Sequence, residues 1–371
     1  MKEREYQKYL RKCDLRDVEP LPLSPGLRCV AVIPACDELE TIGRTLASLV
    51  VPDDCAAMVV VNHPEGADSR VKRSSFELLG RLRAGWSPCR NLHWIDAPDL
   101  RGGVGEARKL GMDAVVASQR ADMLEQTILA SLDADTVAER DYFPEILAEF
   151  GRTPEIAALT IPFRHQPGET PEEELAIRRY EAYLERYVTK LREAGSPYAF
   201  QTVGSAFAVR LDAYVRAGGM RVRRGGEDFY FLQATAKVGT VATGRKVLVH
   251  PSARPSDRVP FGTGPAVRKL MAGERLSEIS DAAFSHLGVL LTLAAAPAGL
   301  DDAELLMGKL DPCFRAFLKE EGFPAVWPKI LANTPKRAGA RLAAFHLWFD
   351  GLRTLRCLHR FDRQQAEKPV I

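Results

Sequence analysis

Two short apolar runs constrain the fold of this chain more than any other feature. The segments LRCVAVI (27–33) and AAMVVVN (56–62) are rich in valine and show no alternation of apolar and polar residues. Strands with this composition are typically buried on both faces, as in parallel sheets. Between the two runs, Ile42, Leu46 and Leu49 recur at helical spacing. Together these segments predict a βαβ unit with a right-handed crossover.

The same alternation continues through the first half of the chain. Helices are expected over 70–84 and 105–119, and strands over 91–95 and 127–133. This pattern predicts an α/β fold, Rossmann-like, with a mostly parallel central sheet and helices on both faces. Ligands of such sheets bind beyond the carboxyl ends of the strands, so polar residues at those ends are candidate site residues.

The second half changes character. Further strands are expected over 156–163, 204–210 and 246–250. A long helix is expected to begin after Thr170, which forms a capping box with Glu173, and Pro171 takes the first helical position. From about residue 276 onward only helical patterning is visible. We therefore expect three parts, which are an N-terminal extension (1–26), the sheet domain (27–275) and a helical C-terminal region (276–371).

Composition restricts the partners and the compartment. Lys and Arg number 51 against 49 Asp and Glu, so no broad positive field favours nucleic acid. The seven cysteines include no CxxC pair, which indicates reduced thiols in the cytoplasm. The charged N-terminus does not resemble a signal peptide, and the longest apolar run (287–300) is too short to span a bilayer. Peripheral contact with the inner membrane face and a homodimer both stay open.

Two carboxylates end the predicted strand 127–133. Asp133 and Asp135 are separated by one residue, and their mutual repulsion is relieved if a cation lies between them. Mg²⁺ and Mn²⁺ suit such a site, and Mg²⁺ is commonly held by one or two carboxylates together with substrate phosphates. The alternative is that Asp135 only caps the segment that follows.

A glycine-rich turn links the strand 91–95 to the helix 105–119. In APDLRGGVGEARKLG (97–111), backbone N–H groups and the helix N-terminus favour an anion such as a diphosphate. Arg101 and Arg108 are placed to add charge-assisted bonds. The turn does not match the dinucleotide-binding fingerprint, and an ordinary turn explains it equally well when it is taken alone.

Four motifs in order resemble the family-two glycosyltransferases of the GT-A fold. They are VIPACDELETI, RGGVGEARKLG, LDADT and the set GSAFAVR, GGM and GGEDFYF, and they cover residues 28 to 258. The resemblance implies a metal-dependent transferase that moves a single sugar from a nucleotide diphosphate-sugar, with UDP or GDP as the nucleotide, to a hydroxyl acceptor. It also implies Mn²⁺ or Mg²⁺ as the cofactor.

The resemblance assigns donor-site roles to several residues. Asp135 is the expected metal ligand, with Asp133 nearer the ribose. His250, which ends a later strand, is interpreted either as a third ligand or as a packed or solvated histidine. The residues implied in nucleotide-sugar binding are Pro34, Ala35, Glu38, Asn62, Arg101, Gly103, Arg108, Asp133, Ala134, Arg254 and Arg258. The last two belong to the loop 251–264, which is interpreted either as a segment closing over the donor or as an ordinary surface loop.

The acceptor side is expected around GGED. The resemblance implies that Asp228, with Glu227 beside it, deprotonates the acceptor hydroxyl in an inverting reaction, because an unassisted alcohol attacks poorly. A retaining outcome, in which Asp228 binds the acceptor instead, stays open, as does a plain helix N-terminus. The charged loop 220–226 just before Asp228 is interpreted as a contact for an anionic acceptor or as a solvated turn.

Some positions depart from the family pattern. Cys36 replaces a frequent aromatic residue, and Asn62 with His63 replaces an acidic pair, which leaves the donor base undecided. One alternative is a nucleotidyltransferase, but the place of its glycine-rich, lysine-bearing signature reads PACDELETI here. A second is a nucleotide-sugar binding protein without activity, which should lack the DxD or the base, whereas both are present.

Overall fold

The computed structural model describes residues 3–13, 26–223, 225–256 and 262–367. The chain divides into two compact units. The first comprises Met1–Glu181 and Thr202–Glu274, and the second comprises Ala182–Gln201 and Arg275–Ile371. The domain limits predicted from the sequence stay a proposal, to which the structure adds that residues 182–201 group with the C-terminal helices.

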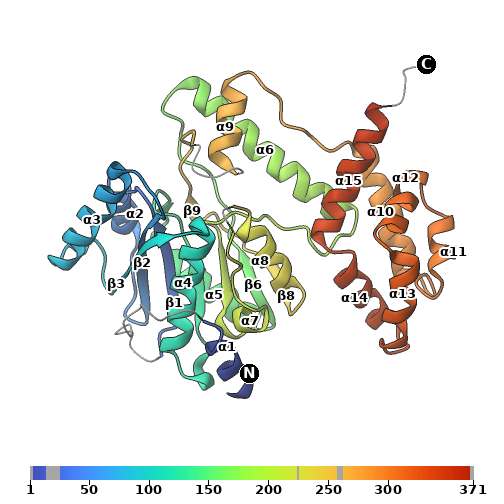
Figure 1. Ribbon diagram of the computed structural model, residues 1–371, viewed down its shortest axis with the longest axis horizontal. Coiled ribbons are helices and arrows are strands. Elements are labelled where there is room, and N and C mark those ends of the chain that lie inside the picture. The colour runs from blue at the N-terminus through green and yellow to red at the C-terminus, as the bar shows by residue number, and fades with distance from the viewer. Residues whose placement is uncertain (1–2, 14–25, 224, 257–261, 368–371) are drawn as a thin grey trace. The chain divides into compact units, whose positions relative to one another are not determined.

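A seven-stranded sheet forms the centre of the first unit, in the order β3-β2-β1-β4-β7-β6-β8 (Figure 1). Among these strands, β7 alone runs antiparallel to its neighbours β4 and β6, so the sheet is mostly parallel, as the sequence predicted. The strands are β1 (Cys29–Ala35), β2 (Cys55–Pro64), β3 (Leu92–Leu100), β4 (Ile128–Ser131), β6 (Ile156–Thr160), β7 (Phe207–Arg210) and β8 (Thr240–Thr243).

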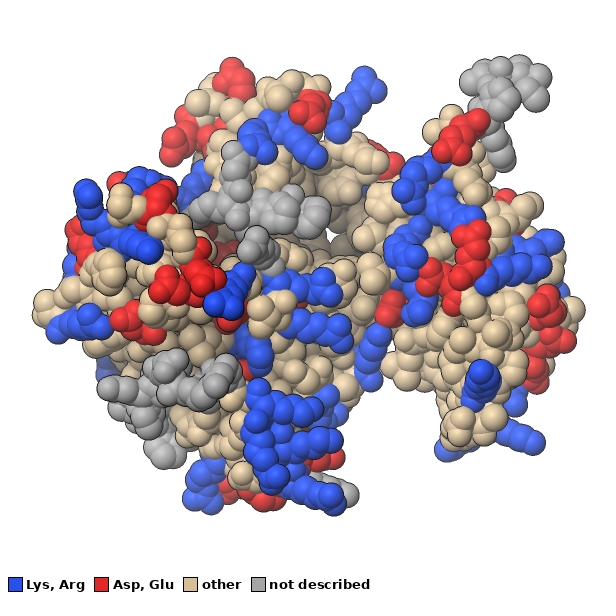
Figure 2. Space-filling view, in the orientation of Figure 1, with Lys and Arg blue, Asp and Glu red and all other residues tan. Residues whose placement is uncertain are grey.

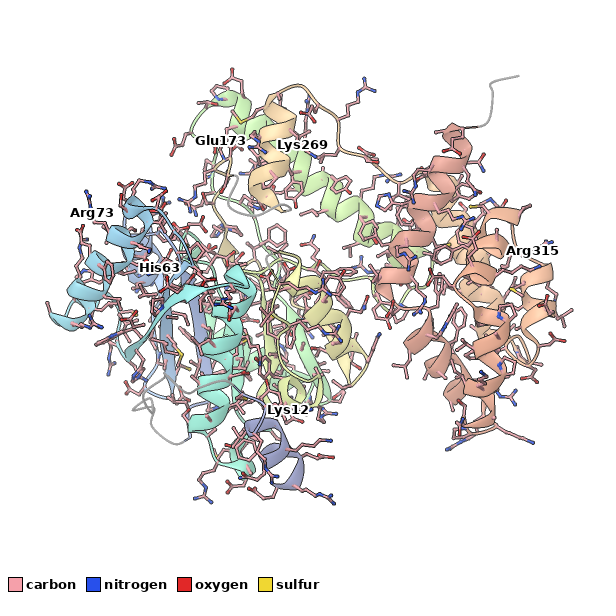
Figure 3. The ribbon with its side chains drawn as sticks, viewed as in Figure 1. Lys12, His63, Arg73, Glu173, Lys269 and Arg315 are labelled. Atoms are coloured by element: carbon pink, nitrogen blue, oxygen red, sulfur yellow. The ribbon has the colours of Figure 1, made fainter. Side chains whose placement is uncertain are left out.

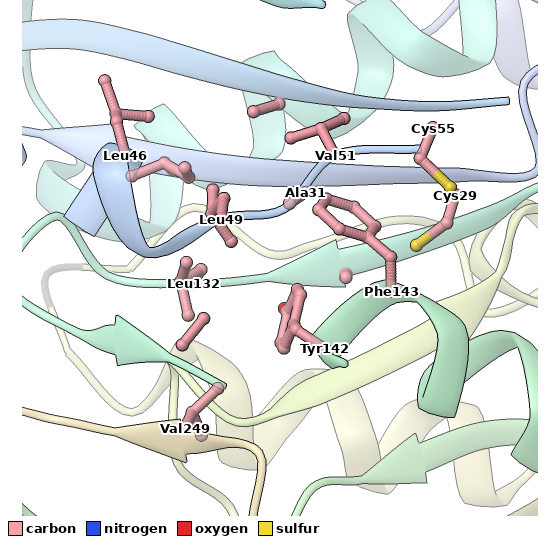
Figure 4. Packing of buried hydrophobic residues seen from close by; sticks show 14 of the residues in the cluster. Cys29, Ala31, Leu46, Leu49, Val51, Cys55, Leu132, Tyr142, Phe143 and Val249 are labelled. Carbon is pink, nitrogen blue, oxygen red and sulfur yellow. The ribbon is translucent and has the colours of Figure 1, made fainter. Parts of the chain in front are cut away.

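Helices cover both faces of the sheet, which explains the continuous apolar runs. On one face, alternate residues of β1 such as Ala31 share a buried cluster with Leu46 and Phe143 from two covering helices (Figure 4). On the other face, Gly111 lies so close that an added Cβ would be 2.6 Å from Val32. The helices of this unit are α2 (Ile42–Ser48), α3 (Ser69–Arg83), α4 (Gly103–Ser118), η1 (Ala121–Met123), α5 (Tyr142–Arg152), α7 (Leu211–Arg216), α8 (Glu227–Ala236), α9 (Thr263–Met271) and the first part of α6 (Pro171–Glu193).

The strand predicted over 246–250 is wrong in extent. Only β9 (Val249–His250) forms, and it pairs with β5 (Val137–Ala138) in a separate two-stranded sheet. The edge position beside β6 is taken by β8, which the sequence did not reveal. An edge strand has one neighbour only, and both threonines that bound β8 are exposed, so no continuous apolar run marks it.

The N-terminal extension contains a helix that binds the sheet unit. Helix α1 (Glu3–Leu10) buries Tyr6 and Tyr9. The Tyr6 hydroxyl donates to two backbone carbonyls near the end of α4, at 3.1 and 2.7 Å. Tyr9 donates to Asp113 at 2.7 Å, and Tyr214 donates to the same carboxylate oxygen at 2.8 Å. The extension is thus fastened to α4 by buried hydrogen bonds.

The second unit is helical and has its own core. Trp327, Phe323 and Phe345 are fully buried there, and the Trp327 indole donates to the Leu300 carbonyl at 2.8 Å. Of the helices in the described residues, none combines the length and apolarity that crossing a membrane requires. The helices are the remainder of α6 with α10 (Asp281–Ala295), α11 (Ala303–Gly308), α12 (Pro312–Glu320), α13 (Phe323–Ala332), α14 (Ala338–Trp348) and α15 (Gly351–Ala366).

Candidate active site

The DxD turn directly follows β4 at the carboxyl end of the parallel strands. Asp133 and Asp135 are partly exposed, with 37% and 17% of their side chains accessible. Neighbouring elements hold the turn. The Thr45 hydroxyl of α2 donates to the Ala134 carbonyl at 2.8 Å, and the Gln166 amide donates to the Asp135 carbonyl at the same distance. Ala134 therefore supports the turn through its backbone, while its side chain is buried.

Arg254 brings the later loop to the DxD turn. Its guanidinium forms ion pairs with Glu38 and, at 2.8 Å, with Asp135. Glu38 is buried just after β1 and also accepts a 2.5 Å hydrogen bond from Thr41. Two carboxylates from separate segments thus share one arginine. The second predicted loop arginine, Arg258, lies outside the described residues.

The predicted three-residue metal site is not assembled. Both ring nitrogens of His250 are engaged at 2.8 Å, Nδ1 by the Arg164 carbonyl and Nε2 by Glu139. No group of three potential metal-binding side chains occurs in the part of the chain that is described. The residues that fit a divalent cation are Asp133 and Asp135, whose hard oxygens suit Mg²⁺ or Mn²⁺ if substrate phosphates complete the coordination.

Arg108 is buried, and this corrects its predicted role as a diphosphate contact. Only 3% of its side chain is exposed. The guanidinium binds Asp133 at 2.8 Å, Glu227 at 3.3 Å and the Ser131 hydroxyl at 2.8 Å. Its Nη1 also donates to the Gly204 carbonyl at 3.1 Å. A sequence signal for this burial existed, because Arg108 shares a helical face with apolar residues four and seven positions later.

Arg101 and the turn before α4 are arranged differently from the prediction. The Arg101 side chain is 80% exposed and pairs with Glu65 at 2.9 Å. The backbone N–H groups of Arg101 and Gly102 donate to the Glu106 carboxylate at 2.8 and 2.6 Å. Gly103 takes up the left-handed conformation that the turn needs, with φ of 64°. The anion position at this helix N-terminus is therefore filled by the chain's own carboxylate, which a diphosphate would have to displace.

Asp228 and Glu227 begin α8 beside Arg108. The preceding Gly226 is left-handed, with φ of 70°, so the chain turns sharply into the helix. Asp228 accepts a 2.7 Å hydrogen bond from the Phe229 N–H. Burial and the nearby Glu227 charge raise the pKa of Asp228 to about 7, against the opposing effect of Arg108. A carboxylate poised near neutrality can exchange a proton with a substrate hydroxyl.

The residues that were predicted to contact the nucleoside lie at the ends of β1 and β2. Pro34 and Ala35 are buried within β1. Asn62 is also buried and uses its amide nitrogen on the Val60 carbonyl at 2.9 Å. His63, the next residue (labelled in Figure 3), is buried, and its ring makes an edge-to-face contact with Phe76 of α3. These strand ends can therefore bind a nucleotide base through backbone atoms and the Asn62 side-chain oxygen.

Sequence reasoning missed several residues that fix the site. Ser131 supports Arg108, and Gln166 ties the DxD turn to the His250 carbonyl at 2.8 Å. Glu106 caps the turn before its own helix, a pattern that its spacing from Arg101 could have revealed. No local signal marks the Gln166 contacts, because they join segments far apart in the chain.

Gly105 provides a test of how closely the loop before α8 packs on α4. A Cβ at this position would lie 2.5 Å from the Arg223 carbonyl oxygen, which is backbone and cannot rotate away. We expect Gly105→Ala to lower the free energy of unfolding by about 1–3 kcal/mol. Gly80→Ala on α3 is the control, since no atom lies within 4 Å of the added methyl. It should stabilise by roughly 0.5–1 kcal/mol. Thermal unfolding measures the stability of both variants. Equal unfolding midpoints would contradict the close packing of the Arg223 carbonyl on Gly105.

Comparisons with known proteins give structural similarity only. No family model and no curated protein sequence matches the chain. TarS 1–349 of S. aureus, in complex with UDP-GlcNAc, is similar over 91% of this chain and 92% of its own, with 13% identity and a TM-score of 0.44. The mannosyltransferase PcManGT from Pyrobaculum calidifontis, in complex with GDP-Man and Mn²⁺, covers 98% and 89%, with 16% identity and a TM-score of 0.40.

Glucosyl-3-phosphoglycerate synthase from Mycobacterium tuberculosis, in complex with Mn²⁺ and UDP-glucose, covers 68% of this chain and 81% of its own. Its identity is 16% and its TM-score 0.38. Similarity at this level does not define an activity. The chemistry of the site must do so.

Proposed function

We propose that this protein is a glycosyltransferase that transfers a single sugar from a UDP- or GDP-sugar to a hydroxyl acceptor, with inversion and with Mn²⁺ or Mg²⁺. One observation carries the proposal. The buried Arg108 guanidinium binds both Asp133 of the DxD turn and Glu227, the neighbour of Asp228. Arg108 therefore links the turn that is suited to a metal-bound diphosphate, through Asp133, to the start of the helix that carries the candidate base, through Glu227.

The donor side follows from charge. Asp135 and Asp133 would hold a divalent ion, whose positive charge would stabilise the leaving diphosphate. Arg254 holds Asp135 and Glu38 in this structure, so its guanidinium is next to the position where that charge develops. We assign Glu38, Asn62 and the end of β1 to the nucleoside. Arg101 is assigned to the outer rim, since its side chain is exposed.

The acceptor side depends on Asp228. With a pKa of about 7, its carboxylate is ionised in a large fraction of molecules at neutral pH and still basic enough to accept a proton. Deprotonation of the acceptor hydroxyl by Asp228 would form the nucleophile as the bond from sugar to diphosphate breaks. Direct displacement of this kind inverts the anomeric centre.

Domain roles and location belong to the same proposal. We assign residues 27–275 to the catalytic domain and 276–371 to a helical region. All seven cysteines lie in the described part of the chain and are free thiols. A reducing compartment, the cytoplasm, suits them.

The donor site can be tested at Asp135, where a divalent ion would compete with the Arg254 guanidinium. We expect Mn²⁺ to strengthen UDP or GDP binding to the wild type, and Asp135→Ala to weaken that Mn²⁺-dependent binding by at least about tenfold. Arg254→Gln should raise the affinity for Mn²⁺ alone, because the competing guanidinium is removed from Asp135. Titration calorimetry measures nucleotide affinity, and electron paramagnetic resonance measures free Mn²⁺.

The matched control is Asp53→Ala. Asp53 also pairs with an arginine, Arg90 at 2.6 Å, but its side chain is 84% exposed and lies outside the site. It should leave both affinities unchanged. If the wild type binds neither nucleotide with Mn²⁺, the proposed function is wrong.

A further inference from the structure

Two arginines just before the candidate base have no carboxylate partner among the residues that the structure describes. Arg221 and Arg223 are exposed, and within the described chain neither forms an ion pair with Asp or Glu. Arg101, on the neighbouring turn, differs because it pairs with Glu65 at 2.9 Å. We call residues 221–223 the arginine loop. Its guanidinium groups keep donors available for a ligand.

The backbone of the arginine loop is held in place. Its Arg223 carbonyl packs over Gly105 of α4, where an added Cβ would meet that oxygen at 2.5 Å and the Glu227 Cβ at 3.1 Å. The loop and Glu227, the residue before Asp228, therefore both pack against α4 at Gly105. Met220, the residue just before the loop, is buried. The two arginines therefore start from a fixed position beside the acceptor side of the site.

One of the two guanidinium groups is also oriented. The Arg223 guanidinium lies over the Tyr230 ring at 3.8 Å from its centroid. Tyr230 follows Asp228 by two residues on α8. A stacked guanidinium uses its face on the ring and leaves its N–H edges for an anion, which it can bind in a bidentate way. Stacking also lowers the entropy that would be lost when a ligand binds.

Charge limits the kind of ligand. On the face drawn in Figure 2, basic side chains form several separate groups among acidic ones and make no continuous surface for a polyanion. The site itself is acidic, with Asp133, Glu227 and Asp228 around one Arg108. A small anion could approach this corner only where unpaired cations offset the repulsion.

We propose that the arginine loop binds an anionic group, a carboxylate or a phosphate monoester, on the acceptor. Anchored there, a small hydroxylated anion presents its hydroxyl to Asp228. This inference rests on the proposed function and deepens it, because it names the acceptor as a hydroxy acid or a polyol phosphate. Neutral sugars and alcohols lack the group that Arg221 and Arg223 recognise.

The test compares charged and neutral probes of the same size. Glycerate, glycerol phosphate and neutral glycerol are titrated into the full-length protein with Mg²⁺ and UDP or GDP, and binding is followed by ligand-observed NMR. We expect both anions to bind and glycerol not to bind. In the double variant Arg221→Gln, Arg223→Gln, anion affinity should fall on the order of tenfold or more. Preference between the two anions identifies the carboxylate or the phosphate as the recognised group.

Controls separate this inference from the proposed function. Arg73→Gln removes another exposed arginine, which lies on α3 away from α8 (Figure 3), and should leave anion binding unchanged. The double variant must keep wild-type nucleotide affinity and the wild-type melting temperature. If it does so and still binds the anions like the wild type, the inference is wrong and the proposed function stands. Binding of glycerol as tight as that of the anions also overturns it.

Discussion

Asp228→Asn is expected to abolish sugar transfer while nucleotide affinity stays at the wild-type value. An amide cannot accept the acceptor proton, and loss of a general base typically lowers a rate by about 10²–10⁴-fold. The side chain keeps its size, so the neighbouring Arg108 and Glu227 contacts should persist. Single-turnover rates and nucleotide titrations on the same preparation measure the two quantities. Transfer at the wild-type rate would exclude Asp228 as the base.

The pH dependence of wild-type transfer should report the same carboxylate. Because the pKa of Asp228 is raised to about 7, the base is mostly protonated at lower pH. The rate should therefore rise about tenfold per unit as the pH approaches 7 from below, and level off above it. In Asp228→Asn this titration should be absent from any residual rate.

Asp228→Asn should also stabilise the folded protein, and the direction of this effect follows from the linkage between protonation and folding. A carboxyl group whose folded pKa is raised destabilises the folded state progressively as the pH rises from its unfolded pKa, about 3.9, to its folded value. The penalty is complete above about 7. Asp228→Asn removes it, so its melting temperature should exceed that of the wild type more at pH 8 than at pH 5. A pH-independent difference would contradict the raised pKa.

Arg108→Met should cause a large loss of stability. It leaves Asp133 and Glu227 without their buried partner, and breaking a buried ion pair from one side typically costs about 3–5 kcal/mol. Arg108→Lys should not restore stability, because one ammonium group cannot reproduce the planar set of bonds to Asp133, Glu227 and Ser131. Chemical denaturation of both variants measures the effect.

Arg101→Ala is the matched control for Arg108. Both arginines come from the same glycine-rich motif, and both were predicted to contact the diphosphate. The Arg101 side chain is 80% exposed, and surface ion pairs such as its pair with Glu65 contribute about 0–1 kcal/mol. Its loss should barely change stability. Similar losses of folding stability in Arg108→Met and Arg101→Ala would show that the buried ion pairs of Arg108 do not stabilise the site.

Much of the architecture could be predicted from the sequence. The valine-rich runs at β1 and β2 marked buried parallel strands, because residues covered on both faces must be apolar along their whole length. The same logic placed Asp133 and Asp135 at a strand end, where the structure has them. The strand β8 escaped prediction, since its exposed edge carries no such pattern.

The amino-acid sequence by itself determined the local parts: which segments form strands or helices, and which carboxylates end them. Only the tertiary structure decided how those groups are shared. It showed that Arg108 is buried between Asp133 and Glu227, that Arg254 binds both Glu38 and Asp135, and that His250 is engaged elsewhere. The physical reason is that burial and ion pairing depend on residues that are distant in the chain, whereas spacing and propensity report only on neighbours.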